Sequence, residues 1–222
     1  MADTEQEMAE RFYGFGSWSS PYWFIGPEQG QSKNENDKLG PRIRAWESLG
    51  KPELVDLKKY HDLISPGLWT REGAPLQKTW RKLMLVLFSS KPDLFDKEDL
   101  REYQRSKLGR TCEEIGETCL IELSGLPANS SRTVRDRKSF VDRRISRIVA
   151  ALETHKPKVV VMYGKGEVRH FGQIVKPLPE LDKATVVGQT LVLFTKHTNA
   201  RKLTDEHWCN LGRSLTEAMQ SA

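Results

Sequence analysis

The run PKVVVMYG, residues 157–164, constrains the fold of this chain more than any other stretch. Residues 159–163 are all apolar or aromatic, and three of them are β-branched valines, so no polar face alternates with an apolar one. A strand of this composition is covered on both faces, as in the middle of a parallel sheet. We therefore expect an α/β fold with helices on both sides of a central sheet.

Other periodic segments alternate around this strand. Short apolar runs predict three more strands, at residues 21–26, 117–124 and 190–195, and a short glycine-bearing gap predicts an added hairpin strand at 184–187. Apolar residues at helical spacing predict helices at residues 42–50, 52–64, 76–88, 96–108, 138–155, 166–175 and 204–219. The expected architecture is a three-layer α/β/α fold around a four-stranded, mainly parallel sheet.

A single domain over residues 1–222 is expected, because Pro and Gly fall between the periodic segments and form no linker. Residues 1–18 are expected to form an N-terminal helical extension. Their beginning is acidic and lacks the apolar core of a signal peptide, and no apolar run approaches the roughly 18 residues that span a bilayer. We expect a cytoplasmic monomer that does not bind membranes.

The net charge indicates which partners to expect, and the cysteine content indicates which cysteine-bound groups to exclude. The chain has 35 Lys and Arg against 30 Asp and Glu, a net charge of +5 that favours anionic partners. Its three cysteines, Cys112, Cys119 and Cys209, lack the number and spacing of a disulfide framework, and no CxxC pair is present. We therefore expect neither a zinc site nor an iron-sulfur cluster.

Polar residues follow each of the four main expected strands. In open α/β sheets, ligands bind beyond the carboxyl ends of the strands, where loops and helix N-termini offer free backbone donors. The residues that would meet at this rim are Glu28, Glu122, Ser124, Lys165, His197, Asn199 and Arg201. This set has the composition of an active site.

Two of these strand ends resemble motifs of the uracil-DNA glycosylase superfamily, whose members cut the N-glycosidic bond of a base flipped out of DNA. The first is Gly26-Pro27-Glu28-Gln29-Gly30 after a hydrophobic strand, and the second is the loop His-Thr-Asn-Ala-Arg, residues 197–201, after the last strand. The strand that ends in a glycine at residue 164 and the order of the elements agree. The resemblance covers residues 20–215.

This resemblance implies a monofunctional glycosylase that acts by hydrolysis, without a metal or an organic cofactor. Glu28 would orient or deprotonate water and offset the positive charge on the deoxyribose, while His197 would donate a hydrogen bond to the departing base. The base would be bound by Gly26, Pro27, Gln29, Glu122 and Ser124. The DNA would be bound by Ser130, Ser131, Arg132, Arg135, Lys165, Thr198, Asn199 and Arg201.

The chain differs from the family pattern at several positions. Thr198 and Asn199 stand where the family has a proline and a phosphate-binding serine, and the four cysteines of an iron-sulfur cluster are absent. Glu122 and Ser124 stand where several branches place an asparagine that reads uracil. The implied base is therefore uracil-like or modified, and the implied role is base-excision repair or defence against foreign DNA such as phage DNA.

Each of these interpretations has a simpler alternative. Glu28 could cap the following turn, His197 could lie in a solvated turn before the last helix, and Glu122 could pair with an arginine. Residues 130–147, with seven cations and two acids, could follow a nucleic-acid backbone or form a solvated helix face with internal ion pairs. For the whole protein, the alternative is a non-catalytic nucleic-acid-binding protein. A metal-dependent nuclease would need clustered carboxylates, which the sequence does not show.

Overall fold

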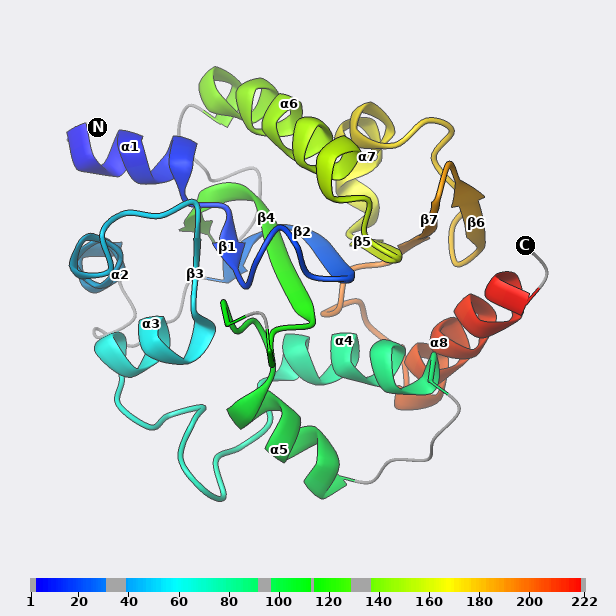
Figure 1. Ribbon diagram of the computed structural model, residues 1–222, viewed down its shortest axis with the longest axis horizontal. Coiled ribbons are helices and arrows are strands. Elements are labelled where there is room, and N and C mark those ends of the chain that lie inside the picture. Colours follow the sequence, from blue (N-terminus) through cyan, green and yellow to red (C-terminus); the bar gives the residue numbers. More distant parts are fainter. Residues whose placement is uncertain (1–2, 31–38, 92–96, 113, 129–136, 221–222) are drawn as a thin grey trace.

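The computed structural model describes residues 3–30, 39–91, 97–112, 114–128 and 137–220 (Figure 1). These residues contain a mixed seven-stranded sheet with the order β3-β1-β4-β2-β5-β7-β6. Its strands are β1 Gly14–Phe15, β2 Tyr22–Gly30, β3 Leu54–Val55, β4 Thr118–Ala128, β5 Val159–Tyr163, β6 Ala184–Val187 and β7 Thr190–Thr195.

Eight α-helices surround this sheet in the described residues. They are α1 Asp3–Arg11, α2 Leu39–Ser48, α3 Leu57–Ile64, α4 Lys78–Ser89, α5 Lys97–Ser106, α6 Arg137–His155, α7 Val168–Ile174 and α8 Asp205–Gln220, with a 3-10 turn, η3 Lys165–Glu167, before α7. No helix among these residues is both long and apolar enough to cross a membrane.

The predicted α/β class is confirmed, but the prediction of a four-stranded sheet is wrong, since the sheet has seven strands in the described residues. The four main predicted strands form its centre, where β4, β2, β5 and β7 pair in parallel. The predicted hairpin strand β6 pairs antiparallel with β7. The two strands that were missed, β1 and β3, have two residues each, which is too short for a periodic signal. Residues 54–55 were expected to be helical.

Side chains of the central strands alternate between two cores, as a sheet covered on both faces requires. Phe24, Leu120 and Leu193 lie in the core beneath α2, α3, α4, α5 and α8. Ile25 and Val160 lie in the opposite core, against α6 and α7. Figure 1 shows these two helical layers on either side of the sheet. The carboxyl ends of β4, β2, β5 and β7 therefore meet at one edge.

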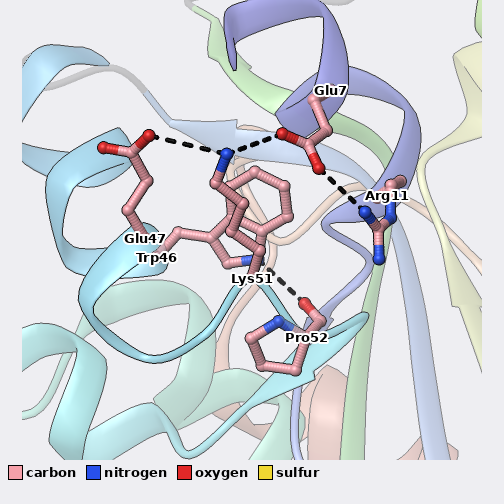
Figure 2. A network of polar contacts seen from close by, with 6 residues as sticks. All are labelled: Glu7, Arg11, Trp46, Glu47, Lys51 and Pro52. Atoms are coloured by element: carbon pink, nitrogen blue, oxygen red, sulfur yellow. Dashed lines mark hydrogen bonds and ion pairs between the residues drawn. The ribbon is translucent and has the colours of Figure 1, made fainter.

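The N-terminal segment is joined to α2 by a charged contact (Figure 2). The Lys51 ammonium, just after α2, donates to Oε2 of Glu7 on α1 at 2.7 Å and lies 3.6 Å from Glu47. It also lies 5.9 Å from the centre of the Trp46 ring. Immediately after α1, Phe12 is completely buried. Residues 3–15 therefore contribute a helix, part of the core and one strand.

Arg144 of α6 ties this segment to β4. Its side chain is fully buried, and its guanidinium donates to the carbonyl oxygens of Glu122 at 2.7 Å and Leu123 at 3.1 Å. It also donates to the carbonyls of Ala9 and Glu10 at 3.1 and 3.2 Å. A buried cation is tolerated only when its donors are satisfied, so α1, α6 and β4 form one unit around this side chain.

Candidate active site

The first candidate residue, Glu28, lies within a strand. β2 continues through Gly26, Pro27 and Glu28 to Gly30, so the prediction of a loop after residue 26 is wrong. The strand is longer because β4 runs beside it, with Glu28 opposite Ser124 and Gly26 opposite Glu122. Glu28 has the same parity as Phe24 on β2, and Glu122 and Ser124 have the same parity as Leu120 on β4. These three side chains therefore lie on the face of the sheet toward α2, α3 and α4. Glu28 itself is half-buried.

The strand with Glu28 and the loop with His197 meet at the end of β5, which lies between β2 and β7 in the sheet. The Tyr163 ring covers Gly26, where a Cβ atom would lie 2.2 Å from the ring. The same ring lies 5.9 Å from the His197 ring, centre to centre. At Gly164, an added Cβ would lie 3.5 Å from Pro27 and 3.8 Å from the His197 ring. Both motifs therefore border the same two residues.

The geometry of His197 fixes which nitrogen carries the proton. Its Nδ1 accepts a hydrogen bond from the backbone N–H of Asn199 at 3.0 Å. Burial, followed by the positive charge of Lys82, lowers the pKa of His197 below its ordinary value of 6.5. A neutral imidazole whose Nδ1 accepts must carry its proton on Nε2. His197 is thus held as a neutral hydrogen-bond donor.

Glu122 is a buried acid beside this junction. Its side chain is only 7% exposed, and its Oε2 has no hydrogen-bond partner among the residues that the structure describes. Burial, followed by the charge of Glu28, raises its pKa to about 8, against the opposing effects of Arg144 and Arg42. Burial, Glu122 and Glu28 also raise the pKa of Tyr163. At pH 7 Glu122 is neutral and offers both a donor and an acceptor.

The raised pKa of Glu122 predicts that the stability of the fold depends on pH. Between 4.5 and about 8 the folded protein keeps a proton on Glu122 that the unfolded chain releases, so this residue's contribution to stability falls as pH rises through that range. We expect the free energy of unfolding to decrease less between pH 5 and pH 8 in Glu122→Gln than in the wild type. Urea unfolding at both pH values, with Glu117→Gln as the control, measures this. Parallel pH dependence in the wild type and Glu122→Gln would contradict it.

Arg42 of α2 supports the end of β2. Its side chain is only 3% exposed and donates to Oε1 of Gln29 at 2.7 Å and to the Gly30 carbonyl at 3.1 Å. Its charge also opposes ionisation of the His61 ring on α3, whose pKa falls to about 3 chiefly because of burial. Gln29, predicted to bind the base, is thus engaged with Arg42. The pair holds the strand that carries Glu28.

The other predicted residues divide into buried and exposed groups. Ser124 is buried, and its hydroxyl donates to the Leu126 carbonyl and accepts from the Leu126 N–H, both at 3.2 Å. Thr198 is also buried, and its hydroxyl donates to Thr79 of α4. Both side chains therefore stabilise the local structure through these hydrogen bonds. The exposed residues at the rim are Lys165, Asn199 and Arg201. Ser130, Ser131, Arg132 and Arg135 lie outside the described residues.

The described part of the basic segment 130–147 packs against the protein. Arg143 pairs with Glu10 of α1 at 2.8 Å, and Arg147 makes two contacts with Glu53, at 2.7 and 2.8 Å. Arg144 is the buried anchor of α1. These three cations fit the alternative of internal ion pairs and contacts better than a surface that follows a DNA backbone.

Three residues of the site were missed from the sequence: Arg42, Lys82 and Tyr163. Tyr163 had a signal, because it is the last residue of the most apolar strand and precedes a glycine at the predicted rim. Arg42 and Lys82 lie in ordinary amphipathic helices, where nothing distinguishes them from solvated cations. Their contacts arise only from tertiary packing.

No protein-family model matches the chain, and no curated protein matches it significantly.

Proposed function

We propose that this protein is a monofunctional DNA glycosylase of the uracil-DNA glycosylase type. The observation that carries the proposal is the meeting of the Glu28 strand and the His197 loop at Tyr163 and Gly164. Its support is chemical: a carboxylate and a neutral imidazole donor border one edge of a sheet where ligands of open α/β folds bind. The four inner strands, parallel as in that superfamily's core, agree with the proposal.

In the proposed reaction, the bond between the deoxyribose and the base breaks and its electron pair leaves with the base. The Glu28 carboxylate stabilises the cationic sugar and accepts a proton from the attacking water. The Nε2–H of His197 donates a hydrogen bond to the base oxygen on which negative charge develops. A neutral imidazole can perform this task, because it polarises the oxygen through a hydrogen bond without being a cation.

Glu122 is the proposed reader of the base. As a neutral acid it presents one donor and one acceptor, the pattern of the asparagine amide that reads uracil in related enzymes. Its unmatched buried oxygen would gain a partner when a base enters. This supports a base with an adjacent ring N–H and carbonyl, uracil-like or modified, in a repair or a defence reaction.

The exposed cations at the rim are the proposed DNA contacts. We expect Lys165→Ala and Arg201→Ala each to reduce the slope of log affinity against log salt concentration by about one, because each removes one phosphate contact. Lys158→Ala is the matched control, since Lys158 is exposed immediately before β5, at the opposite end of the sheet. Binding of a short DNA duplex over a salt series measures the slope. An equal change in the control would argue against this surface.

One experiment tests the activity and the substrate together. The purified protein is incubated with oligonucleotides that each carry one deaminated or modified base, in single and double strands, and alkali then cuts any abasic site. We expect cleavage at one class of base, with unchanged yield in EDTA. Binding without cleavage for every base would favour the non-catalytic alternative.

A further inference from the structure

Two hydrogen bonds join the His197 loop to the first turns of α4. The Thr198 carbonyl accepts a hydrogen bond from the Lys82 ammonium, and the Thr198 hydroxyl donates to Thr79 at 3.3 Å. The Lys82 ammonium also lies 5.7 Å from the centre of the buried Trp208 ring on α8. The half-buried lysine therefore has one partner in the loop and one in the core, which fixes its position.

We propose that Lys82 is a positioning residue that holds the His197 loop against α4 and thereby orients the imidazole. The proposal rests on the proposed function, in which His197 acts as a neutral donor. Lys82 acts through the neighbouring residue: it binds the carbonyl of Thr198 and places a positive charge near the ring. Nothing in the proposal requires Lys82 to touch DNA.

Protonation of His197 would break the contact that orients its ring. In the neutral form Nδ1 accepts from the Asn199 N–H, but a protonated Nδ1 would bring two donors together. The positive charge of Lys82 opposes this protonation, and burial opposes it more strongly. The lysine thus supports the geometry of the loop in two ways, through its hydrogen bond and through its charge.

The groups that face His197 come from several elements. Tyr163 of β5 contributes a neutral ring and Lys82 of α4 contributes the charge. Pro27 of β2 and the His197 ring both lie near the position that a Cβ atom would take at Gly164. The negative charge of Glu28 raises the pKa of Tyr163, whose ring lies next to the imidazole. Lys82 is therefore the cation whose charge opposes protonation of His197.

The test follows the imidazole directly by NMR. The chain has five histidines, and His197→Gln assigns the ring signal of His197. The variants are Lys82→Met and Lys82→Gln, which remove the charge, and Lys82→Arg, which keeps it. Arg81→Met is the matched control, because Arg81 is the adjacent cation and pairs with Asp205 of α8. Each protein is titrated without DNA, and the Asn199 amide signal is followed in parallel.

We expect the pKa of His197 to rise in Lys82→Met and Lys82→Gln and to remain as in the wild type in Lys82→Arg and Arg81→Met. The Asn199 amide should shift with the same midpoint. An unchanged pKa in both neutral variants, or an equal rise in Arg81→Met, would overturn the proposal. Because the titration needs no substrate, its outcome does not depend on whether the protein has glycosylase activity. With a substrate, the acidic limb of turnover should move to higher pH in Lys82→Met and return in Lys82→Arg.

Discussion

Replacing Glu28 with glutamine is expected to lower turnover about a thousandfold, because the amide can neither accept a proton from water nor offset the positive charge on the sugar. The two side chains have the same size, so Glu28 can be changed with little loss of packing beside Ser124. DNA affinity should change by less than about threefold, since the role of Glu28 appears in the transition state. Single-turnover cleavage and duplex binding, measured on the same preparations, separate the two effects.

Glu117→Gln is the control for this substitution. Glu117 lies just before β4, at the amino end of the sheet, and pairs with Lys91 at 3.0 Å. It should retain wild-type turnover. If Glu28→Gln also retained turnover, the assignment of Glu28 as the catalytic carboxylate would be wrong. If the wild type bound DNA without cleaving any base, the non-catalytic alternative would be favoured.

Replacing Arg144 with methionine is expected to lower the free energy of unfolding by about 3 to 5 kcal/mol. The substitution keeps the apolar stem but removes the donors to four carbonyl groups, two on β4 and two at the end of α1. Buried carbonyls that lose their partners carry the full cost of desolvation. Urea unfolding at neutral pH measures the change.

Arg143 provides a matched control one residue away. It is 66% exposed in its side chain and pairs with Glu10 on the surface, so Arg143→Met should cost less than about 1 kcal/mol. A similar loss of unfolding free energy in the two variants would show that the buried contacts of Arg144 do not stabilise the fold. The pair also tests whether the basic segment 130–147 contains residues with separate structural and surface tasks.

The sequence predicted the centre of the fold because its strands carry strong local signals. Val159–Tyr163 is apolar on both faces, and Thr190–Thr195 is similar, so both strands were predicted correctly. β1 and β3 could not be predicted, since two residues give no period and pairing alone defines them. The end of β2 was missed because Pro27, Glu28 and Gln29 have the composition of a loop.

The candidate site was predictable in part for the same reason. The strand ends expected from the sequence grouped Glu28, Glu122 and His197, because parallel strands place their carboxyl ends together. In the structure Glu28 and Glu122 lie within the longer strands β2 and β4. Which cation serves which role was not predictable. Arg144 is buried only because the carbonyls of α1 and β4 converge on it, and Lys82 reaches the His197 loop across 116 residues of sequence.

The proposed position of the Glu28 carboxylate, facing the sugar whose bond is cut, can be tested without knowledge of the base. The measurement compares binding of two DNA duplexes, one with a cationic pyrrolidine and one with a neutral tetrahydrofuran in place of a deoxyribose. We predict that the wild type binds the cationic analogue at least about tenfold more tightly and that Glu28→Gln loses this preference. Equal binding of both analogues by the wild type, or an equal preference in Glu28→Gln, would contradict this position of Glu28.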